Sequence, residues 1–188
     1  MGSDDVKKIV EMTHDIMRNY TKSKGIAVDF TMGNGYDTLF LAQQDFAKVI
    51  AFDIQEESLM RTKALLQQEK QLAKVNLICD GHENLDAYVS AFDVGIFNFG
   101  YLPQTDKCVT TKLATSKIAV EKALACLAVH GVLILVLYPG HAEGKKEADY
   151  FLEKAKALPS KQFAICHIAL MNKKQAPSIL VIERQAKG

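Results

Sequence analysis

The stretch Val28-Asp29-Phe30-Thr31-Met32-Gly33-Asn34-Gly35-Tyr36-Asp37-Thr38 leaves a short apolar run and enters a segment with helical character. Glycines at positions 33 and 35 let the backbone pass close to a ligand, because no Cβ stands in the way. A Gly-x-Gly pair occurs in many turns, so the residues around it decide what it binds. The order of strand, glycine turn and helix predicts a ligand site at the end of a first β-strand.

The flanking segments extend this alternation of strand and helix. Strand-like apolar runs are predicted at residues 26–30, 48–54, 75–79, 92–97 and 131–138, and helices at residues 36–44, 56–71, 110–129 and 143–157. An amphipathic helix with an apolar stripe over residues 6–20 precedes them. Because strands that alternate with helices are joined by right-handed crossovers, these strands should form a parallel sheet.

The last two apolar runs, residues 163–170 and 178–183, break this pattern. The loop between them is too short for a crossover helix, so if the two strands pair they should be antiparallel. A seven-stranded, mostly parallel sheet ending in an antiparallel hairpin resembles the Rossmann-like class I methyltransferase fold more than the nicotinamide-binding Rossmann domain. The sequence therefore predicts an α/β protein with a single such domain over residues 1–188.

The composition restricts the class of protein. A formal net charge of +1 provides no overall attraction to nucleic acid or membranes. The cysteines at positions 79, 108, 126 and 166 lie too far apart to indicate a zinc site or a disulfide scaffold. The polar N-terminus is unlike a secretory signal, and the longest apolar run is too short to span a bilayer. We expect a cytoplasmic protein with no metal site and no membrane partner.

Acidic residues follow three successive predicted strands. Asp29 closes the first strand, Asp53 lies near the end of the second, and Asp80 follows the third. An acid beside the glycine turn would repel a pyrophosphate, but it suits a ligand with an ammonium and a sulfonium, which is S-adenosylmethionine. Asp53 can accept ribose hydroxyls, and Asp80 or its neighbours can bind the adenine amino group. Each acid alone could equally be a helix cap or turn residue.

Thr38 stands where a nicotinamide-binding turn would carry its third glycine, which also favours S-adenosylmethionine. The residues expected to contact this donor are Asp29, Thr31, Met32, Gly33, Asn34, Gly35, Asp37, Thr38, Asp53, Ile54, Gln55, Asp80, Gly81, His82 and Asn98.

The fourth strand leads into Asn98-Phe99-Gly100-Tyr101-Leu102-Pro103. An Asn followed by aromatic residues resembles the Asn-Pro-Pro-Tyr motif of amino-group methyltransferases, although Phe99 and Gly100 replace both prolines. The Asn98 oxygen can accept the N–H bonds of an amine and aim its lone pair at the methyl group. Tyr101 can stack on a base. The alternative is a strand-end turn with a buried tyrosine.

The fifth strand ends at the same edge, so Tyr138 and His141 are expected to line the substrate pocket. An aliphatic amine has a pKa of roughly 10 and must lose a proton before it attacks. His141, His82 or water can accept that proton, while helix capping is an equal alternative for His141. For His14, on the first helix, a surface or packing role is favoured over substrate contact.

These motifs together resemble a bacterial family, the MnmM-type tRNA wobble-uridine methyltransferases, formerly labelled rRNA methylases. The most specific matches are residues 98–103 with Asp106-Lys107, and residues 138–141 with residues 143–146. Family members more often have a small residue and Cys in place of Thr31-Met32, and His in place of Tyr36. The resemblance implies methylation of the aminomethyl nitrogen of wobble 5-aminomethyl-2-thiouridine, with the tRNA anticodon region as partner.

Three other functions remain open from the residues alone. They are methylation of rRNA or of a small-molecule amine, a non-catalytic nucleoside-binding module, and a nicotinamide oxidoreductase, which Asp29 and the terminal hairpin disfavour. A homodimer also remains open. Lysines at positions 107, 112, 145, 146, 173 and 174 fall near the predicted active edge or its flanks, where a few phosphate contacts would suffice for RNA binding.

Overall fold

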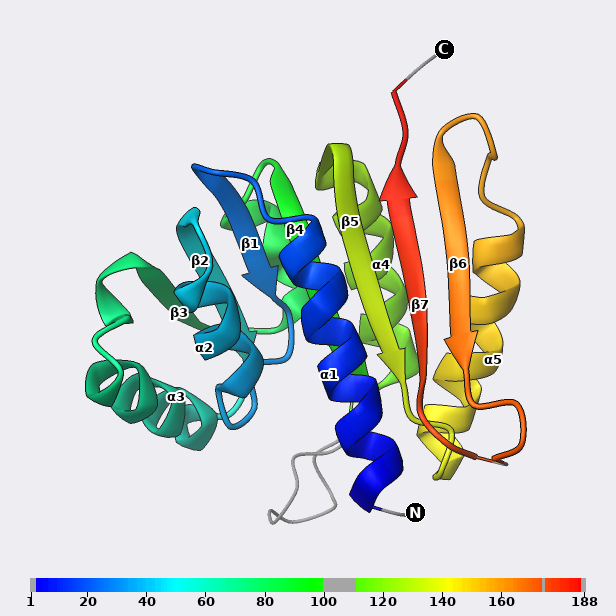
Figure 1. Cartoon of the computed structure of the whole chain (residues 1–188), viewed down its shortest axis with the longest axis horizontal. Coiled ribbons are helices and arrows are strands. Elements are labelled where there is room, and N and C mark those ends of the chain that lie inside the picture. The colour runs from blue at the N-terminus through cyan, green and yellow to red at the C-terminus, as the bar shows by residue number, and fades with distance from the viewer. Residues whose placement is uncertain (1–2, 100–110, 174, 187–188) are drawn as a thin grey trace.

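The computed structural model describes residues 3–99, 111–173 and 175–186, whose strands form one mixed sheet (Figure 1). The strands are β1 (Gly25–Asp29), β2 (Phe46–Asp53), β3 (Val75–Cys79), β4 (Phe92–Phe99), β5 (Leu127–Leu137), β6 (Phe163–Ala169) and β7 (Ser178–Arg184). Their order across the sheet is β3-β2-β1-β4-β5-β7-β6. Strands β1 to β5 pair parallel, whereas β7 pairs antiparallel with both β5 and β6. This confirms the predicted seven-stranded sheet and its terminal hairpin.

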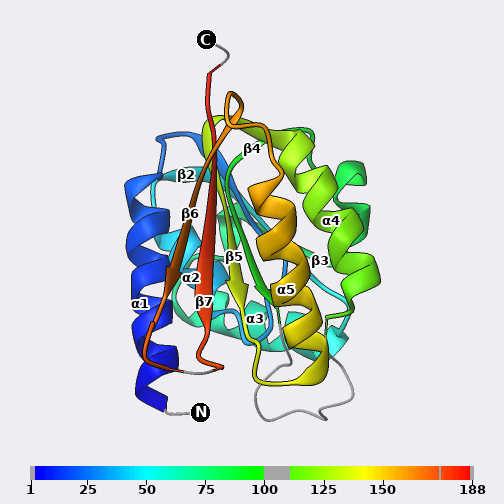
Figure 2. The same cartoon turned by 90° about the vertical axis from the view of Figure 1, so that its right-hand side faces the viewer.

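Helices cover both faces of the sheet (Figure 2). One face carries α1 (Ser3–Asn19), α2 (Tyr36–Gln43) and α3 (Glu56–Gln68), and the other carries α4 (Leu113–Cys126) and α5 (Ala142–Lys156). Two 3₁₀ turns, η1 (Leu72–Lys74) and η2 (His82–Ala87), flank β3. The predicted apolar stripe of the first helix is confirmed at Ile9 and Met17, which are fully buried.

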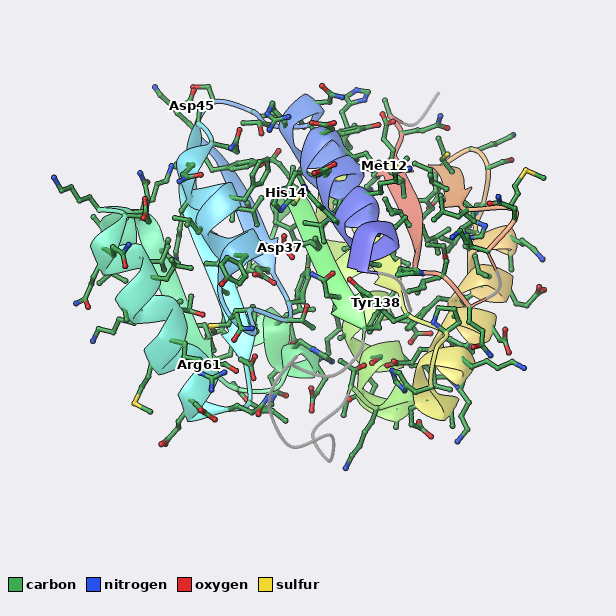
Figure 3. All side chains as sticks on the ribbon, turned by 60° about the horizontal axis from the view of Figure 1, so that its bottom comes forward. Met12, His14, Asp37, Asp45, Arg61 and Tyr138 are labelled. Atoms are coloured by element: carbon green, nitrogen blue, oxygen red, sulfur yellow. The ribbon has the colours of Figure 1, made fainter. Side chains whose placement is uncertain are left out.

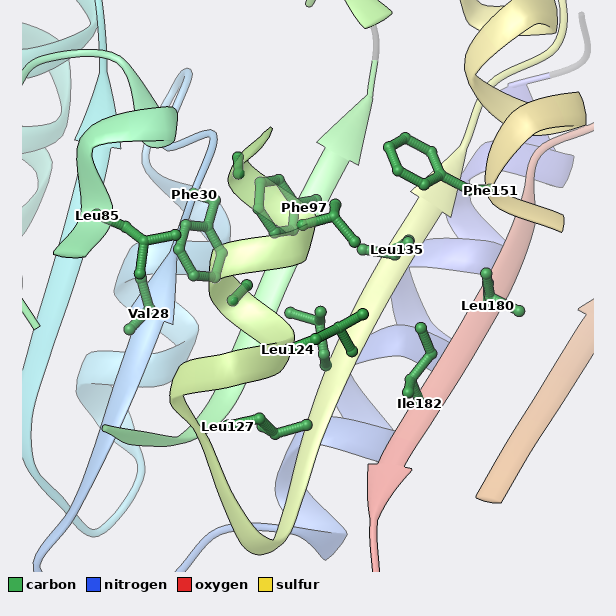
Figure 4. Packing of buried hydrophobic residues seen from close by; sticks show 14 of the residues in the cluster. Val28, Phe30, Leu85, Phe97, Leu124, Leu127, Leu135, Phe151, Leu180 and Ile182 are labelled. Atoms are coloured by element: carbon green, nitrogen blue, oxygen red, sulfur yellow. The ribbon is translucent and has the colours of Figure 1, made fainter. Parts of the chain in front are cut away.

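The central strand β5 is buried from Gly131 to Leu137, as its near-continuous apolar sequence predicts for a strand covered on both sides. Leu133, Leu135 and Leu137 pack into the core on the α4 and α5 side. Their neighbours in sequence point to the opposite core, because successive side chains of a strand face opposite ways. Figure 4 shows part of the α4 side, where the rings of Phe30 and Phe97 stack with centroids 4.1 Å apart.

Two predicted boundaries differ from the structure around β5. The helix predicted over residues 110–129 is α4, which begins at Leu113 and ends at Cys126; β5 then starts at Leu127. Leu127 pairs with Phe92 of β4, so sheet pairing overrides the local helical pattern. Strand β4 extends beyond the predicted residue 97 because Phe99 pairs with Leu137. Asn98 therefore lies inside β4 and not in a loop after it.

In the part of the chain that the structure describes, no helix is both long and apolar enough to cross a membrane.

Candidate active site at the carboxyl edge of the parallel strands

The strand order reverses between β1 and β4, where crossover connections leave toward opposite sides of the sheet. In open α/β sheets this is the position at which ligands bind, outside the carboxyl ends of the strands. The edge lies at the bottom of Figure 1, where β1 runs into the glycine turn and β4 runs down beside it. Most of the side chains that the sequence assigned to the site are found here.

The glycine turn has the backbone conformation that its glycines permit. Gly33 has a φ of 52° and Gly35 a φ of 83°, a left-handed region that other residues rarely adopt. Gly35 is also packed against α3, since a Cβ there would lie 2.7 Å from Thr62 Oγ1. The turn is held further by the Met32 N–H, which donates to the Phe52 carbonyl at 2.9 Å. At position 35 the positive φ and the contact with Thr62 both favour glycine.

Asp29 is fully buried beneath the turn, with 0% of its surface exposed. One carboxylate oxygen accepts the Thr31 N–H at 3.1 Å, and the other accepts the Thr38 hydroxyl at 2.6 Å. Burial, together with the nearby charge of Asp37, raises the pKa of Asp29 to about 7. Asp29 therefore stabilises the turn, which is the alternative that the sequence left open for it. Because its carboxylate is fully buried, it can influence a bound cation only through its charge and not by direct contact.

Asp53 links β2 to the same turn and remains only half-buried. Its carboxylate accepts the Gly33 N–H at 3.0 Å and the Gln55 N–H at 2.9 Å. An ionised carboxylate has about four acceptor positions, so two of them remain for other donors. The next side chain, Ile54, is apolar yet 64% exposed. Asp53 and Ile54 together can contact a nucleoside through its sugar and its base.

Asp80 follows β3 and makes hydrogen bonds within its own segment. It accepts from the Gly81 N–H at 2.7 Å, from Asn84 Nδ2 at 2.9 Å and from the Tyr88 hydroxyl at 2.8 Å. The bonds from Asn84 and Tyr88 are the main cause of its lowered pKa. Gly81 is buried at the start of η2. Asp80 is thus ionised and partly exposed at the edge where the sequence placed an adenine contact.

The His82 ring contacts the main chain directly after β1, at Phe30. Its Nδ1 is 3.1 Å from the Phe30 carbonyl, which can only accept, so Nδ1 carries the proton. Burial lowers the pKa of the ring, which keeps it neutral. Its Nε2 is buried and, among the described residues, has no hydrogen-bond partner. The ring also packs edge-on against Phe97.

Asn98 of β4 is connected to the glycine turn through both its main chain and its side chain. Its backbone N–H donates to Thr31 Oγ1 at 2.8 Å, and its Nδ2 donates to Asp37 Oδ2 at 2.7 Å. The other Asp37 oxygen lies 2.7 Å from His14 Nε2. Figure 3 shows His14 of α1 next to Asp37 of α2, with Tyr138 on the far side of Asp37.

His14 has the packing role that its sequence position favours, and it also contacts Asp37, which the sequence does not predict. Periodicity describes which face of a helix is apolar, and says nothing of what a flanking polar residue meets. In the structure its ring stacks on Phe40, with centroids 3.9 Å apart, and it contacts Asp37. The one available signal was its position next to Thr13, the polar residue within the buried stripe of α1.

The remaining predicted substrate residues differ in how far the structure supports a chemical role. Tyr138 is mostly buried, and burial with the charge of Asp37 raises its pKa to about 12, so it stays a neutral phenol. His141 caps α5, where its Nδ1 accepts the Gly144 N–H at 3.1 Å. This bond occupies the lone pair that a neutral ring would use as a base. Tyr101 lies outside the described residues.

Among the residues that the structure describes, Asp29, Asp37 and Asp53 form no ion pair with Lys or Arg, and Asp37 contacts the His14 ring. The partly exposed carboxylates of Asp37 and Asp53, beside the glycine turn, suit a ligand that brings its own positive charge. The exposed Ile54 adds an apolar contact for a ring. S-adenosylmethionine, which carries a sulfonium, an ammonium and a nucleoside, fits this set of residues.

Comparisons with known proteins identify the family. A family model described as Putative rRNA methylase matches residues 49–184. The chain is 28% identical to the chloroplastic tRNA (mnm(5)s(2)U34)-methyltransferase of Arabidopsis thaliana, over 93% of this chain and 68% of that protein.

Solved structures agree with this assignment. A putative rRNA-methylase from Clostridium thermocellum is 32% identical, with a TM-score of 0.89 over 94% of this chain and 97% of that one. A putative methyltransferase from Streptococcus mutans, in complex with SAH, is 35% identical, with a TM-score of 0.86 and the same coverage. The chain therefore belongs to the Putative rRNA methylase family and is an S-adenosylmethionine-dependent methyltransferase.

Proposed function

We propose that this protein methylates the aminomethyl nitrogen of 5-aminomethyl-2-thiouridine at the wobble position of tRNA. The observation that carries the proposal is the Asn98 amide, held by Asp37 beside the glycine turn. The name of the Arabidopsis relative, a tRNA (mnm(5)s(2)U34)-methyltransferase, supports the choice of this substrate. An aliphatic amine also fits a motif in which Phe99 and Gly100 replace the two prolines.

The methyl donor would be held by the residues at the ends of β1, β2 and β3. Asp53, which accepts the Gly33 and Gln55 N–H groups, would accept the ribose hydroxyls, and Ile54 would pack on the adenine ring. Asp80 and Gly81 would contact the base, and Thr31, Gly33, Asn34 and Gly35 would bind the charged end of the donor. When bound, S-adenosylmethionine supplies a methyl carbon that a neutral nitrogen can attack.

Asn98 is the residue that orients the acceptor. Its Oδ1 accepts an N–H of the substrate amine, which directs the nitrogen lone pair away from Asn98 and toward the methyl group. The pKa of Tyr138 is raised to about 12, so Tyr138 can donate a hydrogen bond but does not accept the amine proton at neutral pH. Tyr101, the remaining catalytic assignment, supplies a surface on which the flipped base stacks.

RNA binding would depend on local positive charge, since the net charge of the chain is only +1. Lys145 and Lys146 are exposed at the start of α5, directly after the loop that contains His141. Phosphate contacts by such lysines release counterions, so tRNA binding should weaken as salt increases. The double change Lys145→Ala and Lys146→Ala should therefore raise the KM for tRNA and reduce its salt dependence.

The test combines cellular and purified assays. Nucleoside mass spectrometry of tRNA from cells lacking the protein should show 5-aminomethyl-2-thiouridine accumulating and its methylated form absent. The purified protein should transfer labelled methyl groups to that tRNA, and Asn98→Ala should abolish turnover while donor affinity is retained. Transfer to rRNA or to small amines but not to tRNA would overturn the substrate, and donor binding without transfer to any acceptor would indicate a binding module.

A further inference from the structure

Three residues that are distant in the sequence form one hydrogen-bonded series beside the proposed amine position. His14 belongs to α1, Asp37 to the first turn of α2, and Asn98 to the end of β4. His14 Nε2 and Asn98 Nδ2 each lie 2.7 Å from a different oxygen of the Asp37 carboxylate. Distances this short are typical of hydrogen bonds to an ionised acceptor.

The Asp37 carboxylate determines which way the Asn98 amide faces. An ionised carboxylate only accepts hydrogen bonds, so the amide atom that meets it must be the nitrogen. The Asn98 oxygen is then directed away from Asp37, and no described residue donates a hydrogen bond to it. Rotating the amide by 180° would place two oxygens against each other. Asp37 thereby leaves an acceptor at the site free for the substrate N–H.

His14 in turn fixes Asp37. A ring N–H donated to Asp37 Oδ1 leaves the other carboxylate oxygen for Asn98. The His14 ring is held in plane by its stack on Phe40, at an interplanar angle of 13°. Phe40 lies one helical turn after Asp37 on α2, so the histidine contacts the same face of that helix twice. The side chains of His14 and Asp37 are 22% and 20% exposed, which limits the water that competes for these bonds.

We propose that Asp37 and His14 are positioning residues for methyl transfer: Asp37 holds the Asn98 amide with its oxygen toward the substrate amine, and His14 holds Asp37. This inference rests on the proposed function. In the step that they serve, the neutral amine nitrogen forms a bond to the methyl carbon while the carbon–sulfur bond breaks. The electron pair of that bond remains on sulfur, and the nitrogen carries the positive charge as an ammonium. The Asp37 carboxylate, linked through Asn98, favours that charge.

Asp37→Asn is the decisive variant because it keeps the shape of the side chain. An amide at position 37 has one oxygen and one NH₂ group, so it keeps the Asn98 contact only if His14 changes tautomer and accepts the new NH₂ group at Nε2. Otherwise the Asn98 amide rotates and turns its own NH₂ group toward the substrate N–H, and in both cases the carboxylate charge that favours the ammonium is lost. We expect kcat to fall on the order of 100-fold, as for other small losses of alignment. His14→Gln, which retains an N–H donor, should keep more activity than His14→Ala.

A double-mutant cycle separates positioning from general damage. If His14 acts through Asp37, His14→Ala should cost little further activity in the Asp37→Asn background. Asp15→Asn is the matched control, since Asp15 lies one residue from His14 on α1 and is exposed, paired with Arg18. It should leave kcat unchanged. Additive losses from His14→Ala and Asp37→Asn, or full activity in Asp37→Asn, would overturn the proposal.

A second measurement needs neither donor nor tRNA. In ¹⁵N-labelled protein, the side-chain NH₂ group of Asn98 should give a distinct, slowly exchanging signal that shifts in Asp37→Ala and in His14→Ala but not in Asp15→Asn. An unchanged Asn98 signal would refute the positioning role whatever the activity. If instead wild type methylates no tRNA while the Asn98 signal responds as expected, the substrate assignment fails and the hydrogen-bonded series stands.

Discussion

The Thr38 hydroxyl donates a hydrogen bond of 2.6 Å to Asp29 Oδ2, and neither residue has any exposed surface. This contact joins the end of β1 to the first turn of α2, on either side of the glycine turn. It also explains why Thr38 stands where a nicotinamide-binding turn has glycine. The turn is thus closed by a buried acid that accepts hydrogen bonds from the Thr31 N–H and the Thr38 hydroxyl.

The first prediction concerns Asp29 and the pH dependence of stability. Burial raises its pKa to about 7 from an ordinary value of 3.8, so between these pH values the folded state binds a proton that the unfolded state has lost. The stability that the protonated Asp29 contributes to the folded state is fully present below pH 3.8 and is lost as pH rises through about 7. As pH increases, the unfolding free energy of wild type, from urea titrations, should therefore fall relative to that of Asp29→Asn, which has no carboxyl group at this position. Its size should be on the order of a few kcal/mol, at roughly 1.4 kcal/mol per pKa unit.

Asp29→Asn can keep both contacts because the Thr38 hydroxyl can reverse and accept from the new amide. Asp149→Asn, an exposed acid on α5, is the control and should show no such trend. In wild type, affinity for the cationic donor should increase as pH rises through about 7, since donor binding favours the ionised Asp29. A donor affinity that is flat between pH 6 and 8, by isothermal titration calorimetry, would contradict this linkage.

The second prediction concerns Gly35. Gly35→Ala should lower the free energy of unfolding by roughly 1–3 kcal/mol, because a φ of 83° is strained for alanine and the Cβ would meet Thr62. Gly81→Ala is the comparison: its φ is −68° and the nearest atoms belong to the flexible end of Glu83. Chemical denaturation should show the larger loss for Gly35→Ala, and equal losses would show that the turn tolerates a side chain.

The third prediction concerns Ile54, whose side chain is 64% exposed without a ligand. If it packs on the adenine ring, Ile54→Ala should weaken donor binding about five- to tenfold, from burial worth on the order of 1 kcal/mol. The melting temperature without donor should hardly change. Met60→Ala removes a side chain of similar exposure, 65%, from α3 and should leave donor affinity unaltered. Equal effects of the two substitutions in a binding titration would remove Ile54 from the donor site.

The fourth prediction concerns Glu147, a fully buried acid on α5. It accepts hydrogen bonds from Ser116 at 2.6 Å and from Thr111 at 2.8 Å, which ties the start of α4 to α5. Glu147→Ala leaves two hydroxyls without their partner and should destabilise the protein by about 2–4 kcal/mol in thermal or urea unfolding. Glu147→Gln should cost much less because hydroxyls can donate or accept. Glu153→Ala, an exposed change on the same helix, serves as the control.

The sequence alone determined the sheet, and it predicted a site at the carboxyl ends of the parallel strands. Alternating strands and helices imply parallel pairing, a short last connection implies an antiparallel hairpin, and glycines at positions 33 and 35 permit the left-handed turn that the structure contains. These features follow from local chemistry and chain connectivity, which a sequence states directly. The sequence did not predict where β4 ends, because pairing of Phe99 with Leu137 extends that strand through Asn98.

Only the tertiary structure decided which polar groups meet at that site. His14 and Asp37 are separated by 23 residues, and Asp37 and Asn98 by 61, so no periodicity in the sequence connects them. Whether Asp29 faces a ligand or lies beneath the turn likewise depends on how α2 packs over β1. Hydrogen bonds between distant side chains are set by distance and direction in space, and these exist only once the helices have packed on the sheet.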